Sequence, residues 1–361
     1  MLANDLVIRE DNCNLSCKYC LTGQSQFKNG HLDRRIFQPP RPDNYSPGAD
    51  LARRIDAVIE ASGRSLRLPI IKVTGGEIFL VRGIMDLLRR LKDQFATVVI
   101  QTNAVLLTPE ILQEIKTWGN ACLQISLDAV SYEGNSYRSE TQDQHQKILA
   151  RIFRALDAGI PTEIYCVLND RSLPEFEETL SQLMRYKDNV VVCPFPVRGP
   201  DRNQFYPKAG QEEVLTRILE SWEEFSDILP PKAYLARLIR FFKDGERQFR
   251  CHLPRFAFTS FDDGHLTSCP NIWFNKLGNV LEGDPSHATG KIGETPFYEL
   301  LLAEKPRVDA CKRCFTPWDL LSMFMDKEIT LDELCQSPMY SAPASRVRIQ
   351  EIANAYWGGK C

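Results

Sequence analysis

Short runs of β-branched and other apolar residues alternate with longer amphipathic stretches from the N-terminus to about residue 200. The apolar runs predict six β-strands, at Leu6–Glu10, Ile70–Thr74, Thr97–Gln101, Leu123–Leu127, Glu163–Leu168 and Val190–Cys193. The stretches between them predict helices, at Ala49–Ser62, Ile84–Phe95, Pro109–Trp118, Gln144–Ala158 and Leu173–Tyr186. Strands separated by helices are typical of a parallel α/β sheet, and the pattern leaves open whether that sheet is flat or curled into a barrel.

The pattern changes beyond residue 204. Two amphipathic stretches, Gln211–Phe225 and Lys232–Lys243, predict a helical connector over residues 205–250. Residues 251–335 read as short strands, glycines and cysteines, and we expect them to form a small α+β domain. The last segment, residues 336–361, contains one predicted helix, Arg346–Tyr356. Residues 1–204 are then the main domain.

Composition narrows the class of protein. With 361 residues, 43% hydrophobic and 25% charged, the chain resembles an ordinary globular protein, and its net charge of -3 argues against a nucleic-acid-binding surface. The chain has no signal-peptide pattern and no run of about 18 apolar residues, so we expect a cytoplasmic protein without a membrane span. Twelve cysteines in such a chain indicate metal or redox chemistry rather than a disulfide framework.

Three of the cysteines, Cys13, Cys17 and Cys20, share one short segment after the first predicted strand. Three thiolates can hold three irons of a [4Fe-4S] cluster and leave the fourth iron open to a ligand, whereas a four-cysteine site is closed. A structural zinc site usually combines two separated pairs of ligands, which this spacing does not provide. The alternatives are a zinc loop or three unrelated cysteines.

The Cys-x3-Cys-x2-Cys run, with the aromatic Tyr19 just before its third cysteine, resembles the signature of the radical S-adenosylmethionine (AdoMet) enzymes. The resemblance implies a partial (β/α)6 TIM-like barrel, an open iron that binds AdoMet, and Tyr19 against the adenine. In that family one electron cleaves AdoMet to methionine and a 5′-deoxyadenosyl radical. We expect a flavodoxin- or ferredoxin-type protein to supply the electron. In barrel-like sheets, active residues gather at the carboxyl ends of the strands.

Gly75, Gly76 and Glu77 follow the second predicted strand and resemble the family's Gly-Gly-Glu motif. The resemblance implies that bent backbone there offers carbonyl groups to the AdoMet ammonium, and two glycines allow the unusual dihedral angles. Paired glycines alone are common in turns. Their place after a strand that follows the cysteine triplet is what makes the motif informative.

The fourth predicted strand carries a second matching segment. Ser126 and Asp128 lie on the same side of that strand, and the resemblance implies contacts to the AdoMet ribose and carboxylate. Arg138 follows ten residues after Asp128 and could pair with the AdoMet carboxylate through two parallel hydrogen bonds. Gln101 and Asn103 are candidate sugar or substrate contacts. A solvated surface or a structural cap is the alternative for Ser126, Asp128 and Arg138.

A second group of cysteines lies in the C-terminal third, at Cys251, Cys269, Cys311 and Cys314. The widely spaced pair Cys251 and Cys269 and the Cys-x2-Cys pair can together close a tetrahedral site. Both zinc and an iron–sulfur cluster fit this number and spacing of ligands. A predicted hairpin over residues 256–268 would bring the wide pair together. The arrangement resembles twitch, the short form of the SPASM extension, which implies an auxiliary [4Fe-4S] cluster. Cys335 is then spare, and His252 lies beside the site.

Three residues are candidates for catalysis. Cys193 ends the sixth predicted strand, and a thiol facing the cavity mouth could give a hydrogen atom to a substrate radical, as an epimerase requires. The alternative is a small apolar residue before a proline turn. Arg198 could bind an anionic substrate group, and Asp128 is the third candidate.

The resemblance implies a radical enzyme that oxidises or epimerises a small natural product, such as an aminocyclitol, a sugar or a nucleoside. The barrel begins almost at the first residue, with no preceding recognition domain, and we expect a small substrate for that reason. The alternative is a maturase that epimerises or cross-links a ribosomally made peptide. An iron–sulfur electron carrier is a third class, which an open-iron triplet followed by Gly-Gly-Glu disfavours.

Overall fold

The computed structural model describes residues 1–8, 12–20, 51–199, 202–282 and 284–359. Its first part contains six parallel strands, β1 (Ala3–Ile8), β2 (Ile70–Gly75), β3 (Thr97–Thr102), β4 (Ala121–Ser126), β5 (Thr162–Leu168) and β6 (Val190–Pro196). All six predicted strands are present, with ends shifted by up to three residues. Positions 9 and 10 of the first predicted strand and positions 49 and 50 of the first predicted helix lie outside the described residues.

Helices connect these strands, at α3 (Leu51–Leu66), η1 (Ile78–Leu80), α4 (Ile84–Lys92), α5 (Pro109–Lys116), α6 (Tyr132–Asn135), α7 (Gln142–Asp157), η2 (Leu173–Glu175), α8 (Phe176–Leu183) and η3 (Met184–Tyr186). Helix α7 begins two residues before its predicted start, because the side chain of Thr141 accepts a hydrogen bond from the backbone N–H of Gln144 and caps the first turn. The predicted helix Leu173–Tyr186 divides into η2, α8 and η3.

The sheet is open and has nine strands in the order β6-β5-β4-β3-β2-β1-β7-β8-β9. Strands β7 (Ala257–Phe261), β8 (His265–Cys269) and β9 (Ile272–Asn279) come from the C-terminal third. Strand β7 pairs in parallel with β1, and β8 pairs antiparallel with β7, as the predicted hairpin requires. The turn of that hairpin contains Gly264 at φ +90°, a conformation that favours glycine. The fold is therefore a partial barrel whose sheet continues into the C-terminal segment.

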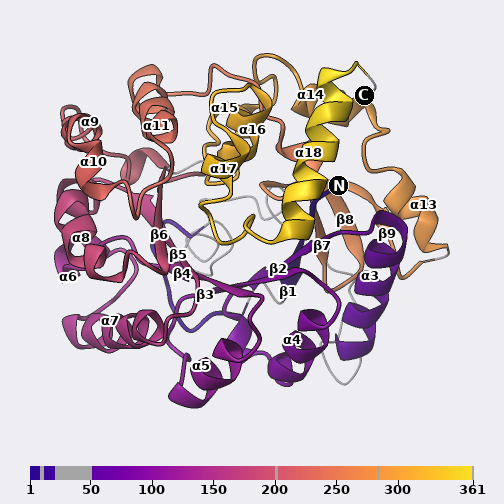
Figure 1. Ribbon diagram of the computed structural model, residues 1–361, viewed down its shortest axis with the longest axis horizontal. Coiled ribbons are helices and arrows are strands. Elements are labelled where there is room, and N and C mark those ends of the chain that lie inside the picture. Colours follow the sequence, from indigo (N-terminus) through magenta and orange to yellow (C-terminus); the bar gives the residue numbers. More distant parts are fainter. Residues whose placement is uncertain (9–11, 21–50, 200–201, 283, 360–361) are drawn as a thin grey trace.

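The remaining helices are η4 (Arg202–Gln204), α9 (Glu213–Glu220), α10 (Trp222–Phe225), α11 (Lys232–Asp244), α12 (Leu253–Phe256), α13 (Pro285–Gly290), α14 (Pro296–Leu301), α15 (Asp309–Lys312), α16 (Asp319–Met325), α17 (Leu331–Leu334) and α18 (Pro343–Trp357). In Figure 1, α4, α5 and α7 lie on one side of the β1–β6 arc, whereas the yellow helices α16–α18 lie on the other. The predicted connector helices are present, the first divided into α9 and α10.

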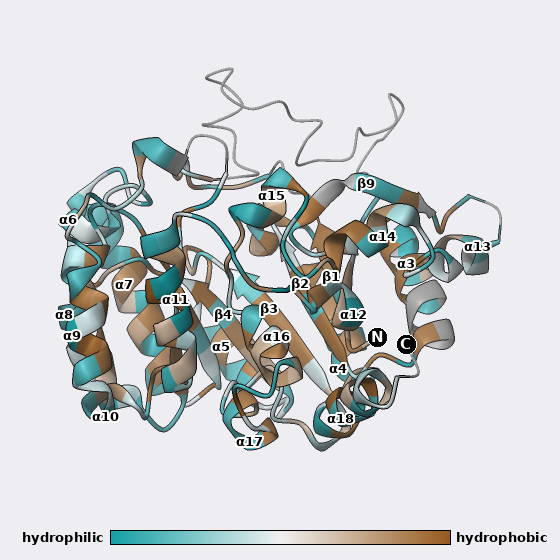
Figure 2. Cartoon of the chain, turned by 90° about the horizontal axis from the view of Figure 1, so that it is seen from above, coloured by the Kyte–Doolittle hydropathy of each residue, from teal (hydrophilic) through white to brown (hydrophobic). Residues whose placement is uncertain are grey.

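Apolar side chains from both parts of the chain form one continuous core. The central strands are largely hydrophobic in Figure 2, and hydrophilic segments lie mainly on the outer helices and loops. The segment after α17 enters this core, since the Ser337 hydroxyl donates to the buried Glu163 carboxylate and Met339 Sδ contacts Gln124. Among the described residues, no helix is long and apolar enough to cross a membrane.

Candidate functional site

The cysteine triplet follows β1 on a loop that the ends of neighbouring strands hold in place. The backbone N–H of Lys18 donates to the carbonyl of Tyr137 at 2.9 Å. The Asn103 amide, just beyond β3, donates to Asn14 Oδ1 at 2.8 Å and lies 3.7 Å from Cys13 Sγ. Asn103 therefore orients the cysteine loop.

Gly75 and Gly76 allow β2 to approach that loop closely. A Cβ atom on Gly75 would lie 1.9 Å from the Ile8 carbonyl oxygen, and one on Gly76 would lie 2.1 Å from the Asn12 carbonyl oxygen. Both distances are far below van der Waals contact, so neither position tolerates a side chain without a backbone shift. The glycines thus fix how the cysteine loop sits against β2.

Glu77 is buried, and its carboxylate joins two strand ends through hydrogen bonds. Its carboxylate accepts hydrogen bonds from the Thr102 hydroxyl and the Asn103 N–H, both at 2.8 Å, and from Phe79 N–H at 3.1 Å. Burial raises the pKa of Glu77, and these donors act in the opposite direction. The predicted motif residue therefore joins the ends of β2 and β3 rather than extending into open space.

Tyr19, Asp128 and Arg138 form one buried polar group. The Tyr19 hydroxyl donates to Asp128 Oδ2, and Arg138 donates to Asp128 Oδ1 at 3.0 Å. The other guanidinium nitrogen, Nη1, lies 3.7 Å from Cys17 Sγ. Asp128 thereby ties the cysteine loop to the end of β4. By holding Arg138, Asp128 also places a positive charge beside the Cys17 thiol, where it would stabilise a cluster-bound thiolate.

A cavity of about 230 Å³ opens beside the triplet. The predicted site residues that line it are Cys17, Tyr19, Cys20, Gly75, Gln101, Ser126, Arg138 and Arg198. The other predicted AdoMet-site residues, Cys13, Gly76, Glu77, Asn103 and Asp128, are not among the cavity-lining residues, and their contacts support the wall from behind. The structure thus brings residues from five of the six barrel strands and their following loops to one place.

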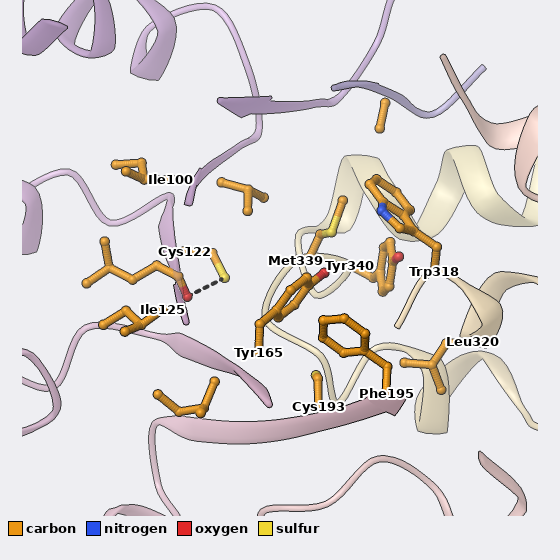
Figure 3. Close-up of a cluster of buried hydrophobic side chains, with 14 of the residues drawn as sticks. Ile100, Cys122, Ile125, Tyr165, Cys193, Phe195, Trp318, Leu320, Met339 and Tyr340 are labelled. Atoms are coloured by element: carbon orange, nitrogen blue, oxygen red, sulfur yellow. Dashed lines mark hydrogen bonds between the residues drawn. The ribbon is translucent and has the colours of Figure 1, made fainter. Parts of the chain in front are cut away.

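Cys193 does not lie at the cavity mouth, and that prediction of its position was wrong. Strand β6 continues to Pro196, so Cys193 is in mid-strand, paired with Tyr165 and almost fully buried. β6 is the edge of the sheet, where Pro194 can remain in a strand because one side needs no donor. Figure 3 shows the thiol beneath Phe195, close to Tyr165.

The four C-terminal cysteines Cys251, Cys269, Cys311 and Cys314 line one small cavity of about 20 Å³. No three His, Cys, Asp or Glu side chains of the described residues are grouped as a single-ion metal site. The buried Arg247 lines the same cavity and donates to Asp319 at 2.6 Å and to the Cys314 carbonyl at 2.8 Å. Four thiols around a cavity with a buried cation fit a cluster of negative charge.

The side chain of His252, which follows Cys251, is directed away from this group, and Cys335, expected to be spare, also lies outside it. His252 Nε2 faces Asp326 at 3.2 Å, and Cys335 Sγ faces the Tyr340 carbonyl at 3.4 Å. Neither lines the four-cysteine cavity. Trp318 and Asn271 line both cavities, so this wall separates the triplet cavity from the C-terminal cysteines.

Sequence reasoning missed Asp5, Lys72 and Trp318 in the triplet cavity. A signal was present for the first two, because each interrupts an otherwise apolar strand with a charge. Trp318 carried no such signal. It reaches the cavity only because the C-terminal segment folds over the barrel.

Comparison with known proteins agrees with this geometry. The family model described as "Radical SAM superfamily" matches residues 7–183, which contain the cysteine loop and β2 to β5. The chain belongs to the radical SAM superfamily.

Two curated relatives match part of the chain. A GTP 3',8-cyclase from Geobacter sulfurreducens is 30% identical over 154 residues, which is 42% of this chain and 41% of the relative. An AdoMet-dependent heme synthase from Methanosarcina barkeri is 26% identical over 216 residues, or 59% and 56% of the two chains. The match thus spans about half the length of these relatives.

Solved structures share the fold over more of the chain. Native anSMEcpe with bound AdoMet and Kp18Cys peptide has a TM-score of 0.59 and 14% identity, and the match covers 98% of this chain and 99% of that one. Streptococcus suis SuiB has a TM-score of 0.58 and 14% identity, with 83% and 68% covered. At this identity the likeness shows the fold alone.

Proposed function

We propose that this protein cleaves AdoMet at a [4Fe-4S] cluster held by Cys13, Cys17 and Cys20, and that it oxidises or epimerises a small molecule. The observation that carries the proposal is the cavity that joins two of these thiols to polar residues at the strand ends. Bound there, the cluster and AdoMet would supply a 5′-deoxyadenosyl radical that removes a hydrogen atom from the substrate.

The residues of the chain have distinct parts in this proposal. Gln101 and Ser126 offer polar groups to AdoMet from β3 and the end of β4, while Tyr19 and Arg138 form the wall beside the thiols. One guanidinium nitrogen of Arg138 already donates to Asp128. Its role is therefore to hold the cysteine loop and to place positive charge near Cys17. Phe195 supplies apolar surface that excludes water from a reactive intermediate.

We further propose an auxiliary [4Fe-4S] cluster on Cys251, Cys269, Cys311 and Cys314. Burial raises the pKa of Cys251 to about 11, against the opposing charge of Arg247, so an uncompensated thiolate there is unfavourable without metal. The shared wall of Trp318 and Asn271 would leave only a thin layer of protein between this cluster and a substrate. An oxidation whose second electron passes to this cluster fits that arrangement, with a flavodoxin- or ferredoxin-type protein as the reductant that supplies the first electron.

Two other reactions have support from particular observations. Cyclisation is favoured by the sequence match to proteins named GTP 3',8-cyclase. Peptide modification is favoured by the shared fold with SuiB bound to its precursor peptide SuiA. We place both second, because the match to the GTP 3',8-cyclase covers only 41% of that relative and the 14% identity to SuiB shows the fold alone.

The test is iron and sulfide per chain after anaerobic reconstitution, together with 5′-deoxyadenosine formed on adding AdoMet and dithionite. We expect about eight irons, and about four in Cys17→Ala or Cys311→Ala, since each should lose one cluster. Cys17→Ala should also abolish deoxyadenosine. Cys122→Ala, a buried cysteine outside both groups, is the matched control and should keep all irons.

The outcomes separate the two parts of the proposal. Deoxyadenosine formation that persists in Cys17→Ala would refute the triplet site. About four irons with one bound zinc in the wild type would refute the auxiliary cluster and favour a reaction without net oxidation.

A further inference from the structure

A buried pair of opposite charges lies in the triplet cavity on the inner face of the sheet. Asp5 on β1 and Lys72 on β2 are direct cross-strand partners, so their side chains project from the same face. Both line the cavity, and both are at least 95% buried. Burying charged side chains this deeply costs free energy unless each charge has a partner.

The pair is incompletely satisfied. Lys72 Nζ lies 3.7 Å from Asp5 Oδ1, which is an ion pair and too long for a good hydrogen bond. Within the described part of the protein, Asp5 Oδ1 has no hydrogen-bond partner. The ammonium otherwise lies 5.6 Å from the ring centres of Tyr165 and Trp318. One acceptor and the donors of one ammonium therefore face the same space.

A group that both accepts and donates would satisfy this pair. A hydroxyl oxygen can accept from Lys72 and donate its own hydrogen to Asp5, whereas a carboxylate or phosphate can only accept and would meet the negative charge of Asp5. The aromatic faces of Tyr165 and Trp318 near Lys72 suit the C–H surface of the same molecule. Burial raises the pKa of Asp5, in keeping with a carboxylate that lacks enough donors.

We propose that Asp5 and Lys72 form a substrate subsite that binds a hydroxyl group, and that the substrate is a polyol or a hydroxylated ring. This inference rests on the proposed function, because it assumes that the triplet cavity receives the substrate. Arg198 lines the same cavity and donates to Asn271 Oδ1 at 2.8 Å, and its charge acts on Asp5 more weakly than that of Lys72.

The experiment uses glycerol as the minimal polyol and acetate as the anion. Crystals of the cluster-loaded protein with AdoMet are soaked in each, and glycerol affinity is measured in solution for the wild type and Lys72→Met. We expect a glycerol oxygen within hydrogen-bond distance of both Lys72 Nζ and Asp5 Oδ1. Lys72→Met should bind glycerol about tenfold more weakly. Lys187→Met, an exposed lysine paired with Asp227, should bind it as the wild type does.

Each outcome decides the matter. Acetate on Lys72 with no glycerol there would replace the hydroxyl subsite by an anion subsite. Glycerol seen at the pair but bound equally well by wild type and Lys72→Met would be an adventitious additive only. Either that result or the absence of glycerol from the pair would overturn the inference. Deoxyadenosine formation is a separate readout, so failure of the AdoMet chemistry is distinguishable from failure of this subsite.

Discussion

Replacing Gly76 by alanine tests whether the contact between β2 and the cysteine loop sets the metal site. The new Cβ would lie 2.1 Å from the Asn12 carbonyl oxygen, while real Cβ atoms essentially never approach closer than 3.0 Å. The loop must therefore retreat by about 0.9 Å, the difference between these distances. That movement breaks or bends the hydrogen bond from Glu77 N–H to the same oxygen, now 2.7 Å long.

The lost hydrogen bond is worth about 1 kcal/mol and overpacking about 1–3 kcal/mol, so we expect Gly76→Ala to lose about 2–4 kcal/mol of unfolding free energy. A protein of ordinary stability stays folded after such a loss. Because Cys13 follows Asn12 directly, the variant should nevertheless reconstitute with about four irons instead of about eight.

The assay is iron and sulfide per chain beside a urea unfolding curve. Gly290→Ala is the matched control, since no atom lies within 4 Å of its new Cβ, and it should keep both iron content and stability. If Gly76→Ala matched the wild type in iron and in unfolding midpoint, the close approach would have no part in shaping the site.

Three further variants test other parts of the structure. Asp319→Ala leaves the buried Arg247 without its carboxylate, so we expect a loss of about 3–5 kcal/mol in urea unfolding and about four irons per chain. Phe176→Ala removes a fully buried ring from α8 and should cost about 3–5 kcal/mol, with iron content unchanged as the check on specificity. Asp5→Asn tests pH dependence: the raised pKa of the carboxyl means that it stabilises the fold below its ordinary value of 3.8 and loses that contribution as pH rises through the raised pKa. The stability of the wild type relative to Asp5→Asn should therefore fall as the pH rises above about 4, and an unchanged difference would contradict a buried titrating Asp5.

The strand and helix pattern of the barrel could be predicted from the sequence because each element has its own periodicity. Ile70–Thr74 is mainly β-branched, with Lys72 as its one charged residue, and the structure confirms it as β2. The C-terminal helix, predicted at Arg346–Tyr356, is present as α18. The end of β6 could not, since Pro194 and Pro196 read as a turn unless the strand is known to be the sheet edge.

The candidate site, too, could be predicted from the sequence only in part. Cysteine spacing and strand ends pointed to Cys17, Gly75 and Ser126, which all line one cavity. The hydrogen bond from Tyr19 to Asp128 could not be predicted from the sequence, because it joins residues 109 positions apart. Contacts of that kind depend on how the loop and the strands are placed in space, and no local pattern records them.

The pairing of β1 with β7 has a consequence for how the protein is made. β1 lies between β2 and β7, yet β2 follows it within 75 residues of the N-terminus while β7 begins at Ala257. During synthesis, one side of β1 therefore remains an edge for most of the chain's length. Such an edge can pair with other nascent chains until the hairpin arrives to cover it, and this long-range closure also slows folding. The C-terminal hairpin thus protects the first strand as well as carrying Cys269.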